Sequence, residues 1–208
     1  RYLREEKKPD WKLRLMISLA DGVWFYMDKE MDQWQKLFSR KPMIALRNTL
    51  SGVNAMTQYV PEHSVSQLKQ KYGIKEDVVL VFCARFTANR RVDLLLETIK
   101  RLNPEVFGFI IIGDGAYKPD FSEYHNVHDF GQLYDTSVKR ELFAIADIYF
   151  QPGWVGLSIV EAMAYGKPIF TFKRSNETLQ CVEYSYIRDR VNGRIFTDVE
   201  ECVSCIEK

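Results

Sequence analysis

From Val78 to the C-terminus, short apolar runs alternate with segments of helical periodicity, and this alternation limits the fold more than any other feature. The run Val78–Cys83 is continuous and β-branched, which is typical of an interior parallel strand covered on both faces. The segment Val92–Leu102 repeats apolar residues every three or four positions, as an amphipathic helix does. Strands and helices alternating at this spacing predict an α/β fold, a doubly wound parallel sheet of the Rossmann-like type.

The other elements expected in this region keep the same order. The expected strands are Phe109–Ile112, Val127–Phe130, Ile148–Phe150, Pro168–Phe172 and Arg194–Phe196. The expected helices are Val138–Ala146, Leu157–Tyr165 and a last one from Val199 to the end. In such a sheet, ligands bind at the carboxyl ends of the strands. The loops at these ends cover residues 85–91, 113–115, 131–133, 153–158 and 173–178, where glycines and cations are concentrated.

A smaller β-α-β unit is expected before the main alternation. Its elements are a helix over residues 1–20, a strand at Val23–Met27, a helix at Asp28–Phe38 and a strand at Met43–Leu46. These are too few elements for a stable domain. We therefore expect their apolar faces to pack on the main domain or on a second copy of the chain, as a homodimer. The pattern breaks after Thr49, which indicates a linker and divides the chain into residues 1–55 and 56–208.

Composition excludes several classes of protein. The 208 residues carry a formal net charge of +1, whereas nucleic-acid-binding domains usually have a marked basic excess. No apolar run approaches the ~20 residues that a membrane span needs. Residues 1–5 include neither a start methionine nor a signal peptide, so we expect a fragment of a longer protein.

The four cysteines favour buried thiols over a metal or redox site. Cys202 and Cys205 form a C-x-x-C motif inside the expected C-terminal helix, with no second pair and no nearby histidine. Reduced cysteines fit a cytoplasmic protein. We expect no metal site.

The stretch Asp147–Pro168 reads as strand, glycine turn and helix, ending on a C-cap glycine, Gly166. A helix that begins directly after a strand presents free backbone N–H groups and the positive end of its dipole, which suits a phosphate. Glu161 follows Ser158 by one turn, within reach of hydroxyl groups on a molecule that carries this phosphate. Together these features predict a nucleotide site.

The same stretch resembles a known family. From Pro152 to Pro168 the pattern PGxxGLSxxEAMAxGxP is similar to the signature of the family 4 retaining glycosyltransferases, which have the two-domain GT-B fold. In that family the helix binds the diphosphate of a sugar nucleotide, and the glutamate that matches Glu161 binds the ribose hydroxyls. The family usually has a second glutamate, eight positions earlier, in contact with the donor sugar. Here that position is Gly153.

Arg85 and Arg90 stand in one short loop, where both can face a common anion. The alternative is a solvated basic loop. The resemblance favours a functional role, because the family binds the donor diphosphate with an arginine at the position of Arg85 and a lysine at that of Arg90. Arginine in place of lysine changes the geometry, so Arg91 can share the role.

The resemblance extends to two further loops. Gly113-Asp114-Gly115 is similar to the family's Gly-x-Gly beneath the nucleotide, although a plain turn has the same pattern. Gly131 and Leu133 match the ends of a segment whose backbone meets the base. The resulting donor-binding candidates are Arg85, Arg90, Gly113, Gly131, Leu133, Gly153, Gly156, Leu157, Ser158 and Glu161. Glu161, Arg85 and Arg90 are the catalytic candidates. The family needs no metal, because cations and the helix terminus stabilise the leaving diphosphate.

The resemblance implies that the chain is the C-terminal, donor-binding domain of a GT-B glycosyltransferase, with a β-α-β remnant of the acceptor domain. The full enzyme is expected to transfer a sugar from a nucleotide diphosphate sugar to a glycan, lipid or small-molecule acceptor, with retention and with no cofactor. A homodimer through the remnant and peripheral membrane association of the full protein are open alternatives for its partners. The alternative functions are a non-catalytic sugar-nucleotide-binding module and a GT-B sugar-nucleotide epimerase.

Overall fold

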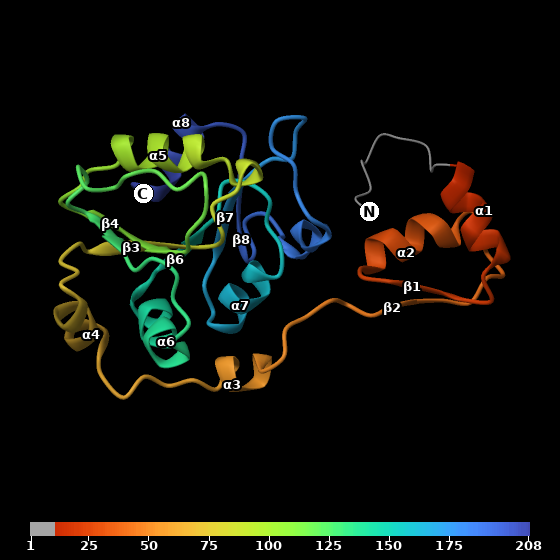
Figure 1. Cartoon of the computed structure of the whole chain (residues 1–208), viewed down its shortest axis with the longest axis horizontal. Helices are drawn as coiled ribbons and strands as arrows, with labels where there is room; N and C mark the ends of the chain where they lie inside the picture. Colours follow the sequence, from red (N-terminus) through yellow and green to blue (C-terminus); the bar gives the residue numbers. More distant parts are fainter. Residues whose placement is uncertain (1–10) are drawn as a thin grey trace.

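The structure, a computed structural model, describes residues 11–208 and consists of a large α/β domain and a small N-terminal unit (Figure 1). The part of the expected first helix within residues 1–10 lies outside the described residues. The described part of that helix is α1 (Trp11–Leu19), and the small unit continues with β1 (Val23–Phe25), α2 (Asp28–Gln35) and β2 (Met43–Ala45). The expected order of elements in this unit is therefore confirmed over the described residues.

The large domain is built on one parallel six-stranded sheet in the order β5-β4-β3-β6-β7-β8. Its strands are β3 (Val78–Cys83), β4 (Phe107–Ile112), β5 (Val127–Asp129), β6 (Ile148–Phe150), β7 (Ile169–Phe172) and β8 (Gly193–Phe196). The chain runs from β3 outward to β5, returns to the other side of β3 at β6, and then runs outward to β8. This is the expected doubly wound α/β fold, and the strand order reverses between β3 and β6.

Helices cover both faces of this sheet (Figure 1). Helices α5 (Val92–Arg101) and α8 (Val199–Ile206) pack on one face, and α4 (Val65–Tyr72), α6 (Thr136–Ile145) and α7 (Ser158–Ala164) pack on the other. Two short 3₁₀ helices lie in loops, η1 (Ala88–Arg90) and η2 (Val182–Tyr186). The aromatic segment around Cys181, to which the sequence assigned no element, thus contains η2.

The central strand β3 shows why its sequence is apolar without interruption. Val79 and Val81 point into the core beneath α4, α6 and α7, whereas Leu80 and Phe82 point into the core beneath α5 and α8. All four side chains are essentially fully buried. Removing each such side chain from water contributes about 1.5–3 kcal/mol to the stability of the fold. The two cores therefore hold β3 in place and fix the position of the loop that follows its carboxyl end.

The linker is more ordered than its sequence indicates. Residues Val53–Thr57 form a short helix, α3, which packs against α7. Just beyond it, the Tyr59 ring meets the Tyr165 ring edge-on, with 6.3 Å between centroids. The prediction of an irregular segment missed α3 because its stability comes from contact with α7, over a hundred residues further along the chain.

The small unit keeps much of its apolar surface exposed. Its strands form a separate parallel pair in which Trp24 lies opposite Ile44, and these side chains are 76% and 52% exposed. In α1, Leu19 is 77% exposed. Within residues 11–208 the main domain does not cover these side chains, because the unit meets that domain through α2 and the segment after β2. Packing on a second copy stays a prediction.

The contact between the two parts centres on Asn48. Its Nδ2 donates to Glu183 Oε1 at 2.8 Å, and its carbonyl oxygen accepts from the Tyr186 hydroxyl at 2.9 Å. Both partners come from η2, so this 3₁₀ helix is the part of the large domain that Asn48 contacts. Over residues 11–208, no helix combines the length and the apolar character that crossing a bilayer requires.

Candidate functional site

The candidate site lies where the strand order reverses, at the carboxyl ends of β3 and β6. A doubly wound sheet opens a crevice at this point, because the loops after the two central strands turn to opposite faces. Here the loop after β3 carries Arg85 and Arg90, and the loop after β6 carries Gly153 and Gly156. The two loops touch, since the Arg90 guanidinium donates from Nη1 to the carbonyl oxygen of Trp154.

The start of α7 offers free hydrogen-bond donors. Within residues 11–208, the backbone N–H groups of Gly156, Leu157 and Ser158 donate to no protein acceptor. The N-cap residue Leu157 has no side chain that could cap them. Backbone donors that follow one another around a helix start match the oxygens of a phosphate group, so these residues lie as the sequence analysis predicts.

Glu161 has a partner that the sequence did not reveal. Its Oε2 lies 2.7 Å from Nζ of Lys139, in α6, and the two side chains are only 12% and 24% exposed. Burial lowers the pKa of Lys139, but the neighbouring Cys83 and Glu161 raise it by a larger amount. The net effect is a raised pKa, so the lysine stays protonated. The sequence analysis placed this carboxylate within reach of ligand hydroxyls and did not foresee the lysine, which binds one of its two oxygens.

The three arginines of the β3–α5 loop have different roles. Arg85 is exposed, and no residue in the described part of the chain pairs with it. Arg90 is half-buried: its Nη1 is bound to Trp154, and its Nε is buried without a partner. Burial, together with the nearby Arg85, lowers the pKa of Arg90 from its ordinary value. Arg85 is therefore free for an anion, while Arg90 also braces the loop after β6.

Arg91 is committed to other contacts. It has a left-handed backbone with φ of 50°, and its guanidinium pairs with Asp93 at 2.7 Å. Its Nη1 donates to the Thr178 hydroxyl at 2.5 Å. The Asp93 carboxylate raises the pKa of Arg91. These bonds tie α5 to the loop after β7, so the Arg91 guanidinium is already held by two partners.

Gly113 lies where two loops approach each other closely. Its backbone has φ of 143°, and a Cβ there would stand 2.0 Å from the carbonyl oxygen of Ala84. Its N–H donates to the carbonyl oxygen of Gly131 at 2.7 Å. Gly131 also has a left-handed backbone, with φ of 60°, while the half-buried Leu133 packs on the core beside α6. The structure thus brings these three residues to the same end of the sheet as Arg85.

Gly153 explains the departure from the family pattern. It is buried, and a Cβ at this position would lie 2.5 Å from the carbonyl oxygen of Asn89 and 2.9 Å from the carbonyl carbon of Arg90. The backbone of η1 therefore fills the space that a glutamate side chain would need. Trp154, the next residue, has φ of 45°, an uncommon conformation for a bulky side chain. A glycine at position 153 is therefore matched to the packing of this loop.

A buried polar network beneath the loop was missed by the sequence analysis. Gln151, fully buried, accepts from the hydroxyls of Tyr149 at 2.6 Å and Ser158 at 2.9 Å. Its Nε2 donates to the Trp154 carbonyl oxygen at 2.8 Å. Burial raises the pKa of Tyr149, so its hydroxyl keeps its proton. The only signal in the sequence was a polar residue directly after an apolar strand.

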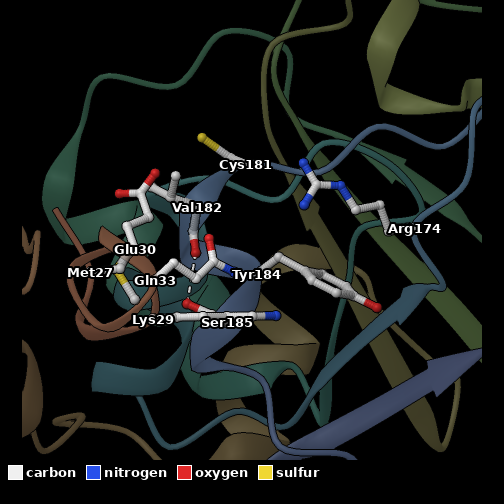
Figure 2. Close-up of a pocket in the computed structure, with 9 residues that line it drawn as sticks. All are labelled: Met27, Lys29, Glu30, Gln33, Arg174, Cys181, Val182, Tyr184 and Ser185. Atoms are coloured by element: carbon white, nitrogen blue, oxygen red, sulfur yellow. Dashed lines mark hydrogen bonds between the residues drawn. The ribbon is translucent and has the colours of Figure 1, made fainter. Parts of the chain in front are cut away.

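Two pockets lie elsewhere and are lined by none of the ten donor-binding candidates. One, of about 480 Å³, lies between α5, α8 and the loop after β7, and is lined by Arg91, Lys173, Arg174, Glu97 and Glu200 among others. A second pocket, between α2 and η2, is shown in Figure 2. Its Cys181 thiol is half-buried, and burial and the nearby Glu183 raise its pKa to about 11. Because a protonated thiol is a weak nucleophile, this pocket shows no sign of covalent chemistry.

Comparison with known proteins defines the class of protein. The profile of the family "Glycosyl transferases group 1" matches residues 77–208, which is more than half of the chain. The chain therefore belongs to this glycosyltransferase family. No curated protein matches it by sequence.

Solved structures agree on the GT-B fold, which confirms the fold class expected from the sequence. HepE of Anabaena in complex with UDP has 21% identity and a TM-score of 0.66, over 99% of this chain and 60% of HepE. WaaG, a glycosyltransferase involved in lipopolysaccharide biosynthesis, has 23% identity and a TM-score of 0.64, over 88% of this chain and 52% of WaaG. TarM has 16% identity and a TM-score of 0.65, over 94% of this chain and 38% of TarM. The chain thus spans roughly two fifths to three fifths of these proteins.

Proposed function

We propose that the chain is the donor-binding part of a retaining GT-B glycosyltransferase, which transfers a sugar from a nucleotide diphosphate sugar to a glycan, lipid or small-molecule acceptor. One observation carries the proposal: in a chain of this family, the free N–H groups of Gly156–Ser158, the unpaired Arg85 and the carboxylate of Glu161 lie around one strand-order reversal. The amides and Arg85 suit a diphosphate, and Glu161 suits ribose hydroxyls. HepE, a structural neighbour, binds UDP.

The chemistry follows from these groups. When the bond between sugar and diphosphate breaks, negative charge grows on the leaving phosphate. Fixed N–H groups and Arg85 would stabilise this charge, which is an electrostatic form of catalysis. Glu161 binds the ribose and does not contact the breaking bond. The acceptor side of the reaction requires the remainder of the acceptor domain, so we expect the 208-residue chain to bind nucleotide and to transfer little or no sugar.

A screen of nucleotides tests the proposal directly. UDP, GDP, ADP and CMP are added in turn to the chain, and the midpoint of thermal unfolding is measured. A ligand that binds only the native state at a hundred times its Kd stabilises that state by about 2.7 kcal/mol. We expect at least one nucleoside diphosphate to raise the midpoint, and to do so more than CMP, which lacks the second phosphate. No shift with any diphosphate would contradict the proposal.

Two substitutions locate the nucleotide. Glu161→Ala and Arg85→Ala are each expected to weaken binding of the stabilising diphosphate by about 1.5–3 kcal/mol, the scale of a hydrogen bond to a charged group. Isothermal titration calorimetry measures the change. Glu141→Ala is a matched control, since it removes a helix glutamate that pairs with Lys71 at 2.6 Å, away from the reversal point. Unchanged affinity in both site variants would remove this assignment.

The packing of Gly153 favours a second candidate, a sugar-nucleotide-binding module without transferase activity. The family's donor-sugar glutamate is missing, and the backbone of η1 fills its place. Release of nucleoside diphosphate by the full-length protein, in the presence of donor and acceptor, distinguishes the two. Release at a rate that depends on acceptor supports the transferase, and tight binding without release supports the module.

A further inference from the structure

Lys139 of α6 is the nearest charged neighbour of Glu161, although the two are separated by 22 residues in the sequence. It follows the N-cap residue Asp135 by about one turn, so its side chain extends from the amino end of α6. Its ammonium group also lies over the ring of Phe143, 5.9 Å from the centroid. The lysine therefore reaches Glu161 along a partly apolar path and arrives at the carboxyl end of β3, next to Cys83.

This pair is less exposed than an ordinary surface ion pair. Both side chains are at most 24% exposed, whereas in the pair Lys71–Glu141 the lysine is 50% exposed. A half-buried carboxylate without a partner is unfavourable. The ammonium group of Lys139, 2.7 Å from Oε2, gives this carboxylate a partner and holds it in one orientation.

The pair occupies only one oxygen of the carboxylate. Lys139 binds Oε2, while Oε1 accepts no hydrogen bond from any residue in the described part of the chain. An oxygen that is fixed in position and unoccupied is suited to a hydroxyl group, because little side-chain freedom is lost when the ligand binds.

We propose that Lys139 is a positioning residue of the donor site, which holds Oε2 of Glu161 so that Oε1 is presented to a ribose hydroxyl. The inference rests on the proposed function. Lys139 acts through Glu161 and does not itself contact the nucleotide. Its removal should therefore affect recognition of the ribose hydroxyls and leave recognition of the diphosphate unchanged.

The test compares ribose with dideoxyribose. The affinities of the 208-residue chain for UDP, GDP and ADP, and for the 2′,3′-dideoxy form of each, are measured by calorimetry; the tightest pair is then used for all variants. We expect Lys139→Met to weaken binding of the ribonucleotide about tenfold and of its dideoxy form less than twofold. Lys139→Arg keeps a charged donor and should retain the ribonucleotide affinity within about threefold. Lys71→Met is the matched control, and neither affinity should change.

Each result decides the question. If the unmodified chain binds none of the three diphosphates, the proposed function fails and the inference fails with it. If the unmodified chain binds but Lys139→Met keeps its preference for ribose, only the inference fails. An equal loss for the ribo and dideoxy forms would also overturn it, since the lysine would then act on the phosphates or on the fold. If Lys139→Met does not fold by circular dichroism, the same comparison is made with Lys139→Gln.

Discussion

Gly153→Glu is expected to destabilise the protein by at least about 4 kcal/mol, because it combines a steric overlap with a buried, unpaired charge. The added Cβ would lie 2.5 Å from the carbonyl oxygen of Asn89 and 2.9 Å from the carbonyl carbon of Arg90. These are backbone atoms of η1, which cannot rotate away as a flexible side chain can. The rest of the glutamate side chain would have to displace η1 or enter the core.

Urea unfolding followed by circular dichroism measures this effect. Gly156→Ala is the control in the same loop, since a Cβ at Gly156 has no neighbour within 4 Å. We expect the control to change stability by no more than about 0.5 kcal/mol, as surface substitutions usually do. A Gly153→Glu variant as stable as the parent would show that η1 moves aside easily. The family's second glutamate could then be restored by one substitution, contrary to the packing described above.

The result bears on the chemistry of the site. If η1 cannot move aside, no glutamate side chain fits at position 153, and the donor sugar must be bound by other residues. Three features of the loop are linked: Gly153 packs on η1, Trp154 has a left-handed backbone, and Arg90 binds the Trp154 carbonyl oxygen. A single reversion would therefore not recreate the family's sugar contact.

Gly113→Ala is expected to lower the free energy of unfolding by about 4 kcal/mol, because backbone strain and steric overlap act together. The backbone has φ of 143°, which residues with a Cβ rarely adopt, and the added carbon would stand 2.0 Å from the carbonyl oxygen of Ala84. That oxygen cannot withdraw easily, because β3 and β4 pair up to Cys83 and Ile112, and the Ala84 N–H donates to the Ile112 carbonyl oxygen.

Gly131→Ala separates the two contributions. Gly131 also has a positive φ, of 60°, but a Cβ there has no neighbour within 4 Å. Its substitution should cost only the conformational part, about 1–2 kcal/mol. The difference between the two variants in chemical denaturation then measures the overlap at Gly113. Equal losses would indicate that the two loops separate without strain and that the close approach does not hold the site together.

Much of the fold was predictable because it depends on local patterns. The continuous apolar run Val78–Cys83 predicted a strand covered on both faces, and β3 has these bounds. Strand β4 begins at Phe107, two residues earlier than expected, because Phe107 and Gly108 pair with Val78 and Val79 in the neighbouring strand. Helix α7 ends at Ala164, within one residue of its expected bound, and Gly166 has the positive φ, of 70°, that a C-cap glycine adopts.

The positions of the candidate site residues were predictable in outline, whereas their contacts were not. The residues at Arg85, Gly113 and Gly156–Ser158 come to one end of the sheet, as strand order and loop position require. Lys139 was missed, because nothing in α6 shows which helix will face it. The linker helix α3 and the contact of Asn48 with η2 were also missed, because both depend on residues far away in the sequence.

The sequence alone determined the alternation of elements, the glycine turn before α7 and the family, because each is written in residues close together along the chain. The tertiary structure decided which charges pair, which of the three arginines is free and how closely η1 approaches Gly153. Those outcomes depend on distances between residues of loops and helices that are 22 to 87 positions apart in the sequence. Such loops become neighbours only when burial of both faces of the sheet fixes the strand order and brings the carboxyl ends of β3 and β6 together.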